Sequence, residues 1–310
     1  VMLADSISLL CYGVLRGNHA LRFESLGIFV GQICTLVFGG AALLIHPSLH
    51  LLVLALLVGS TFNAVFSATR VAGIYGIGVL RPMYDRDAMR ALLVTAFPFA
   101  LAGIFVKVYS YVDSIIISKI IGTAAVGVYA VAYKFTYAFQ FLPMAFVAAL
   151  YPGMSALVGK RDTEGLTRLF DKAIWYMTVL GAPIAFGLWA VADDAIALAG
   201  KGYGTAAPVL ATLIFVLIPI FLDFPVGSLL NAANRQITKT AVMGVTMVLN
   251  VACNLVLIPP FGLLGAAYSA VISFIFLFLA GFWFVPRIIP AYGLSRLLRT
   301  TVPILGSAAV

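Results

Sequence analysis

Three ionisable side chains interrupt long apolar runs, and they are the residues whose types and depth could do chemistry. Lys107 lies near the middle of the apolar run 91–118, Asp113 follows it in the same run, and Lys134 lies in the next run. An ionisable group at the centre of a bilayer costs about 2.5–3.5 kcal/mol on insertion scales, so such groups face a protein-lined cavity or each other. The pattern predicts a membrane protein whose interior handles something polar.

The two lysines are predicted to lie at matching depths on consecutive antiparallel helices, each about 14–17 Å from the outer surface at 1.5 Å per residue. Two ammonium groups at one depth would attract an anion such as a phosphate or pyrophosphate headgroup. A second interpretation stays open, because Lys134 could pair with Asp113 and fix the helix register. Lys107 has no acid nearby and is the better substrate candidate, although its side chain could also extend toward the interface.

Asp223, in the segment LIPIFLDFPVGSLLN, is a second intramembrane acid. An acid in a proline-broken helix suits proton or cation coupling, whereas the alternative is a carboxylate that caps backbone amides freed at the kink. Tyr129, Tyr133 and Tyr137 recur every four residues and so form one helical stripe. Tyr133 and Tyr137 are candidates to stack on sugar rings, and simple helix packing is the alternative.

Six side-chain amides in the apolar segments either line a polar cavity or bridge helices by hydrogen bonds worth about 0.6 kcal/mol each. They are Gln32, Asn63, Gln140, Asn231, Asn250 and Asn254. Asn250 joins Asp113 and Asp223 as a structural or coupling candidate.

The composition indicates which elements hold these residues. Hydrophobic residues make up 63% of the chain and charged residues 10%, against about 45–50% and 25% in soluble domains. The apolar runs are apolar on every face, which excludes the alternating pattern of a transmembrane β-barrel. We expect an all-α polytopic membrane protein with spans near 1–15, 25–45, 51–79, 91–118, 124–157, 173–192, 205–232, 240–258, 262–285 and 300–310. The first and last spans look truncated, so we expect an internal piece of a longer protein.

The basic residues indicate the topology. One alternate set of loops carries fifteen Lys and Arg, Arg235 and Lys239 among them, whereas the other set carries only Lys119 and Lys201. By the positive-inside rule the loop 16–24 is cytosolic, as is every second loop after it. The charges are scattered over short loops and form no dedicated domain, so we expect no nucleic-acid partner.

Four regions are predicted from these spans. Residues 1–80 form the C-terminal part of a first transmembrane lobe, and residues 81–90 are a cytosolic linker. Residues 91–286 form a second lobe of six helices. Residues 287–310 form a cytosolic loop and the start of a further helix.

Enzyme motifs are absent from the sequence. The stretch GMSALVGK, residues 153–160, has one residue too many for a phosphate-binding loop, and Arg161 follows where Ser or Thr is needed. Cys11, Cys34 and Cys253 fit no metal-binding or disulfide spacing. We expect no catalytic residue, no cofactor and no metal site.

Two stretches carry a family resemblance. Residues 231–273 read NAANRQITKTAVMGVTMVLNVACNLVLIPPFGLLGAAYSAVIS, with a small-residue turn, Asn250 and a proline–glycine connection. Residues 112–135 read VDSIIISKIIGTAAVGVYAVAYKF, with Asp113 before a turn at Gly122. Over about residues 90–290 the chain resembles the polysaccharide flippase branch of the multidrug/oligosaccharidyl-lipid/polysaccharide (MOP) exporter superfamily.

The resemblance implies a MATE-like transporter of twelve to fourteen helices in two pseudo-symmetric lobes, with alternating access. It implies flipping of undecaprenyl-pyrophosphate-linked oligosaccharide, as in O-antigen and lipopolysaccharide synthesis, across the bacterial inner membrane. The partners would be this substrate, membrane lipids and a coupling ion, H⁺ or Na⁺.

Rival interpretations remain open. They are a cation-coupled multidrug antiporter and a peptidoglycan lipid-precursor flippase of the same superfamily. A membrane-embedded glycan polymerase or ligase is disfavoured, because such enzymes usually carry a large outer loop.

Overall fold

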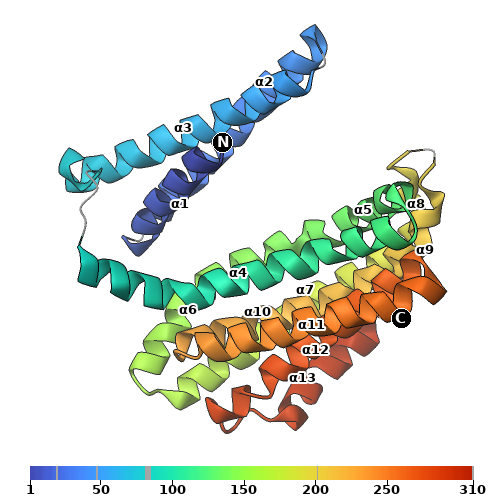
Figure 1. Cartoon of the computed structure of the whole chain (residues 1–310). Helices are drawn as coiled ribbons and strands as arrows, with labels where there is room; N and C mark the ends of the chain where they lie inside the picture. The colour runs from blue at the N-terminus through green and yellow to red at the C-terminus, as the bar shows by residue number, and fades with distance from the viewer. Residues whose placement is uncertain (19, 47, 81–84, 201, 309–310) are drawn as a thin grey trace. The chain divides into compact units, whose positions relative to one another are not determined.

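The computed structural model describes residues 1–18, 20–46, 48–80, 85–200 and 202–308, and every regular element within them is helical (Figure 1). Eight helical segments in this part of the chain are long and apolar enough to cross a membrane. They are 21–45, 49–75, 86–120, 123–159, 163–190, 204–232, 236–261 and 263–287. The prediction of an all-α, multi-pass membrane protein is confirmed. Lys201 and residues 81–84 lie outside the described residues.

The chain divides into two compact units, residues 1–89 and 90–310. The first unit packs three helices against one another, α1 (Met2–Gly17), α2 (Leu21–Ile45) and α3 (Leu49–Tyr75), followed by the 3-10 helix η1 (Ile77–Leu80). A Cβ at Gly27 or Gly31 of α2 would overlap Tyr12 or Asn63, and Tyr12 donates a hydrogen bond to Asn63 Oδ1 at 2.8 Å. Small residues on α2 therefore allow close helix approach.

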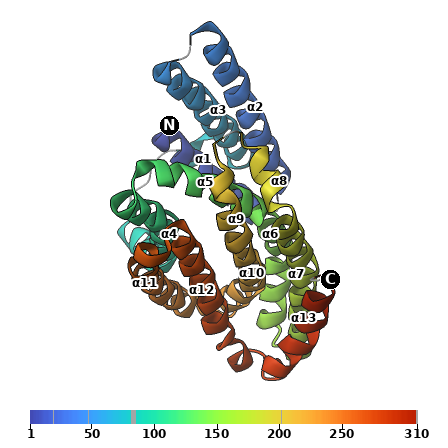
Figure 2. The ribbon, with the colours of Figure 1, turned by 90° about the vertical axis from the view of Figure 1, so that its right-hand side faces the viewer.

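The second unit contains the remaining elements, except that the first turn of α4 precedes its boundary at residue 90. In chain order these are α4 (Arg86–Ile120), α5 (Thr123–Tyr137), η2 (Ala138–Gln140), α6 (Phe141–Gly159), α7 (Thr163–Ala190), α8 (Ala192–Ala197), η3 (Gly204–Ala206), α9 (Ala207–Leu213), η4 (Ile214–Val216), α10 (Leu217–Ala232), α11 (Gln236–Phe261), α12 (Leu263–Phe282), η5 (Val285–Arg287) and α13 (Leu294–Ala308). Helix α10 packs against α6, α7 and α12 (Figure 2). It is the central helix of this unit.

Helix α4 begins within the stretch predicted as a linker. The carboxylate of Asp85 accepts hydrogen bonds from the backbone N–H groups of Asp87 and Ala88, at 2.9 and 3.3 Å. A side-chain acceptor before the first turn is a typical N-cap, and the helix then continues through Pro98 into the membrane-spanning segment.

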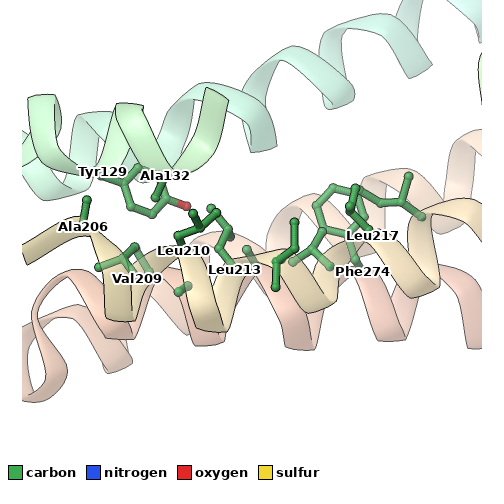
Figure 3. Close-up of a cluster of buried hydrophobic side chains, with 14 of the residues drawn as sticks. Tyr129, Ala132, Ala206, Val209, Leu210, Leu213, Leu217 and Phe274 are labelled. Carbon is green, nitrogen blue, oxygen red and sulfur yellow. The ribbon is translucent and has the colours of Figure 1, made fainter. Parts of the chain in front are cut away.

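The largest apolar core lies between α5, α9, α10 and α12. Figure 3 shows Tyr129 and Ala132 of α5 packed over Leu210 and Leu213 of α9. Tyr129 is 1% exposed. This core fixes α5, and with it the tyrosine stripe, against the centre of the unit.

Helices α11 and α12 form a tight antiparallel hairpin. The connection is Gly262, whose φ of +60° and ψ of −134° favour glycine. A Cβ at Gly265 would overlap the backbone carbonyl of Leu257, so the two helix ends approach more closely than any larger residue allows.

Helix α4 contacts α11 at several levels. Thr240 donates a hydrogen bond to the carbonyl of Pro98 at 3.0 Å. Near the middle of α4, the ring of Phe105 lies against Gly244, where a Cβ would come within 2.9 Å of it. These contacts place one face of α4 beside α11.

The C-terminal segment packs on the second unit. Helix α13 lies against α7, where Arg296 forms an ion pair with Asp171 at 3.1 Å. The buried ring of Tyr292 contacts Phe170 edge-on, with centroids 4.8 Å apart. The described part of residues 287–310, which were predicted to form a loop and the start of a further helix, therefore adds a packed helix to this unit.

Candidate functional site

The second unit contains a partly open cavity of about 460 Å³ between α4, α5, α6, α10, α11 and α12. Cavities of roughly 300–1,000 Å³ with a few polar groups are typical of small-molecule sites. The polar side chains in its wall are Ser110, Tyr133, Tyr137, Gln140, Asp223, Ser228, Asn231 and Lys239. The rest of the wall is apolar, so these groups determine what the cavity binds.

One ion pair lies in the cavity wall. The ammonium of Lys239 donates to both carboxylate oxygens of Asp223, at 2.6 and 2.7 Å. The two side chains are 11% and 15% exposed. Asp223 does not cap the backbone of its proline-containing helix, as one interpretation held, because its carboxylate is directed to Lys239.

The prediction of Lys239 as a cytosolic loop charge is wrong. Lys239 instead lies in the first turn of α11 and is 9% exposed. Asp223 lies nine residues before the end of α10, and Lys239 lies three residues after the start of α11. At 1.5 Å per residue the two Cα atoms therefore differ in depth by about 9 Å. The two side chains together span that difference, and a helical hairpin with a basic residue just after its turn is the signal that could have found the pair.

Two stacked tyrosines form an aromatic wall of the cavity. The rings of Tyr133 and Tyr137 have centroids 4.0 Å apart and planes inclined by 23°. Tyr137 also contacts Phe274 of α12, with centroids 6.3 Å apart. The stripe therefore lines the cavity at Tyr133 and Tyr137, while Tyr129, one turn earlier, is enclosed in the apolar core.

The other intramembrane acid is held by neutral donors. Asp113 of α4 is 3% exposed. It accepts a hydrogen bond from the hydroxyl of Tyr129 at 2.9 Å and from the amide of Asn254 at 2.6 Å. The Asn254 amide also donates to the carbonyl and side-chain oxygens of Asn250, at 2.9 and 3.2 Å. Asp113 thus joins α4, α5 and α11.

Helix α12 completes this network. Ser269 donates to the carbonyl of Asn250 at 3.1 Å, and the Asn250 amide lies 3.5 Å from the Ser269 hydroxyl. The side-chain oxygen of Asn254 is buried without a donor. Among the residues that the structure describes, no group of three or more His, Cys, Asp or Glu is placed to hold a metal.

The two lysines that were predicted to bind substrate, Lys107 and Lys134, lie away from the cavity wall. Lys134 is exposed on α5, and the ion pairs in the described chain join Arg16 to Glu24, Arg168 to Glu164, Lys239 to Asp223 and Arg296 to Asp171. The suggested pairing of Lys134 with Asp113 is therefore wrong, because Tyr129 and Asn254 occupy the carboxylate. Lys107 is also exposed, with its ammonium 5.9 Å from the centroid of the Tyr111 ring.

Five of the six side-chain amides take one of the two roles that the sequence left open. Gln140 and Asn231 line the cavity. Asn63, Asn250 and Asn254 bridge helices by hydrogen bonds.

Two family models each match about half of the chain. The model described as MatE matches residues 98–256. The model described as polysaccharide biosynthesis protein matches residues 1–158. The first match covers α11 as far as Val256 and most of the cavity wall, whereas the second covers the first unit and ends at Val158, one residue before the end of α6.

Curated relatives are also similar to the chain. The probable flippase AglR of Haloferax volcanii is 28% identical over 276 residues, which are 85% of this chain and 55% of that protein. A probable low-salt glycan biosynthesis flippase of the same organism is 23% identical, over 76% of this chain and 49% of that protein. The succinoglycan biosynthesis transport protein ExoT of Rhizobium meliloti is 28% identical, over 48% and 31% respectively. The chain spans about half the length, or less, of these relatives.

Proposed function

The chain belongs to the polysaccharide flippase family of the MOP exporter superfamily. We therefore propose that it is part of a transporter that flips a lipid-linked oligosaccharide across a membrane. The relatives named as flippases or glycan transport proteins support this proposal. The finer part of the proposal names undecaprenyl pyrophosphate as the lipid carrier and the bacterial inner membrane as the site. In this proposal the protein works by alternating access and catalyses no covalent step.

The observation that carries the proposal is the cavity within the second unit. Its wall offers stacked aromatic rings, side-chain amides and hydroxyls, and one ion pair. Aromatic faces and amides suit sugar rings, which present apolar C–H faces beside hydroxyl groups. An ammonium suits the phosphate that links sugar to lipid. One cavity thus holds complementary groups for both parts of such a headgroup.

The predicted residues receive distinct roles in this proposal. Tyr133 and Tyr137 form the sugar-contacting wall. Lys107 and Lys134, on exposed faces of α4 and α5, add positive charge along the path of the headgroup outside the cavity. Among the coupling candidates, Asp113 with Asn250 offers oxygen acceptors for H⁺ or Na⁺, and Asp223 faces the cavity.

The match to the MatE model favours one second candidate, a cation-coupled multidrug antiporter. Such a transporter needs an uncompensated acid to hold a cationic drug in a low-dielectric cavity. The cavity here pairs its one described acid with Lys239. The peptidoglycan-precursor flippase remains a variant of the leading proposal with a different glycan.

The test is deletion of the gene in its own host, with measurement of lipid-linked oligosaccharide on each side of the membrane. We expect the oligosaccharide to accumulate on the cytosolic side and to be cleared by the wild-type protein. The Tyr133→Ala/Tyr137→Ala double variant should clear it poorly, whereas the matched Tyr133→Phe/Tyr137→Phe variant, which keeps both rings, should retain most activity. Normal glycan export in the deletion strain, together with sensitivity to cationic drugs, would favour the antiporter instead.

A further inference from the structure

The Lys239–Asp223 pair differs from a structural ion pair because it borders open space. A fully enclosed ion pair is often no more stabilising than apolar residues of the same volume. Here both side chains line the cavity. Gly227, one helical turn after Asp223, lies directly beside the lysine, where a Cβ would stand 3.2 Å from Lys239 Cε and 3.6 Å from Nζ. The absence of a side chain at Gly227 leaves the ammonium accessible from the cavity.

Lys239 supplies the positive charge of this cavity. Among the described lining residues, the others are apolar or neutral except for Asp223. Ser110, Ser228 and Asn231 add neutral donors around the same space. An anion that enters the cavity therefore meets one ammonium, and that ammonium already holds a carboxylate through two short hydrogen bonds.

A carboxylate bound through two oxygens to an ammonium resembles one face of a phosphate bound to it. Both ligands present oxygens that share negative charge and accept hydrogen bonds at about 2.7–2.9 Å. A lone ammonium in a low-dielectric cavity would hold a phosphate strongly, which would oppose release on the far side. A competing carboxylate lowers the affinity and keeps the site exchangeable.

We propose that Lys239 binds the phosphate or pyrophosphate group of the transported molecule, and that Asp223 occupies the ammonium when the cavity is empty. This inference rests on the proposed function and adds the residue that contacts the anionic part of the headgroup. Binding exchanges one anion for another on Lys239, and release restores the carboxylate. Asp223 is thus a competitor that sets the affinity, and Lys239 is the binding residue.

The test compares anion binding by four forms of the intact, detergent-purified protein: wild type, Lys239→Gln, Asp223→Asn and the double variant. Inorganic pyrophosphate is the probe, and isothermal titration calorimetry gives the Kd. Asp223→Asn should bind about tenfold more tightly or better, because a like charge beside a bound anion costs several kcal/mol. Lys239→Gln and the double variant should show no binding at this site, while Lys239→Arg, which keeps the charge, should retain it.

A structural role for the pair predicts the opposite pattern. The double variant removes both charges and keeps both side-chain shapes. If the pair were only structural, the double variant would bind pyrophosphate with the wild-type Kd, and Asp223→Asn would bind it more weakly or equally well. Either result overturns the inference. If Lys239→Gln fails to fold, as judged by thermal unfolding, the Asp223→Asn titration alone still decides between tighter and unchanged binding.

A competition measurement determines whether the bound phosphate belongs to a lipid or to a soluble compound. A polyprenyl pyrophosphate lipid in nanodiscs should compete with inorganic pyrophosphate for wild type and for Asp223→Asn. Failure of this competition would overturn the lipid assignment and leave a site for a soluble phosphate compound. Tighter binding by Asp223→Asn in a protein whose deletion leaves glycan flipping intact would refute the proposed function while supporting the anion site.

Discussion

The two intramembrane acids of the second unit have opposite surroundings. Asp113 is enclosed where α4, α5 and α11 meet, and neutral hydroxyl and amide donors hold it. Asp223 faces a cavity, and a single ammonium holds it. Neutral donors join Asp113 of α4 to α5 and α11, whereas the ion pair cancels the charge of Asp223 next to open space. The comparison separates an acid that organises the bundle from an acid that regulates access to a binding group.

The largest expected effect is at Asp113. Asp113→Ala leaves the Tyr129 hydroxyl and the Asn254 amide without their acceptor, and hydrogen bonds to charged groups contribute about 1.5–3 kcal/mol each. We expect the free energy of unfolding to fall by about 3 kcal/mol or more, measured as a lower melting temperature in detergent. Asp223→Ala is the matched comparison and should lose less stability, because the single ammonium it leaves without a partner borders open space. Equal losses at the two acids would remove the distinction between them.

A smaller loss of stability is expected on substitution of Gly265, which lies in the hairpin that carries Asn250 and Ser269 of the Asp113 network. An added methyl group in Gly265→Ala would overlap the Leu257 carbonyl, and overpacking of this kind costs about 1–3 kcal/mol. The melting temperature should fall, while pyrophosphate binding in the cavity should change less. A selective loss of anion binding, with unchanged melting, would show that the hairpin turn acts on the cavity instead.

Removal of one hydroxyl group, from Tyr129 or from Tyr133, tests the contribution of the hydrogen bond to Asp113. Tyr129→Phe removes a donor to Asp113 and should cost about 1.5 kcal/mol of stability, the lower end of the range for a hydrogen bond to a charged group. Tyr133→Phe, one turn further on, keeps its ring against Tyr137 and should melt like wild type. Equal melting temperatures for the two variants would mean that the Tyr129 hydroxyl contributes nothing.

The smallest expected effect is at Lys107. Its ammonium is exposed over Tyr111, and an exposed charge contributes about 1 kcal/mol or less. Lys107→Ala should therefore slow flipping by no more than about fivefold, measured by the oligosaccharide accumulation assay. Lys239→Gln should abolish flipping in the same assay. Complete loss at Lys107 would move the main anion contact to the exposed face of α4.

The sequence predicted the helices well, because length and all-round apolarity are sufficient to identify membrane spans. It predicted that Asp113 and Asp223 are special, since an acid among leucines and phenylalanines needs a partner. It could not predict which partner, because a helix that is apolar on every face gives no indication of which face meets which neighbour. Lys239 was misplaced for a related reason: a basic residue next to a turn has the same pattern whether it faces the cytosol or turns inward.

The glycine connection at Gly262 has a mechanical consequence. A one-residue turn and an approach that excludes even a methyl group at Gly265 leave α11 and α12 almost no freedom to slide or splay. The two helices therefore behave as one rigid plate that carries Lys239 near one end and Asn254 near the other. In the proposed transport cycle α11 and α12 would therefore move as one body, and α4, which Thr240 and Asn254 hold to α11 by hydrogen bonds to Pro98 and Asp113, would move with them.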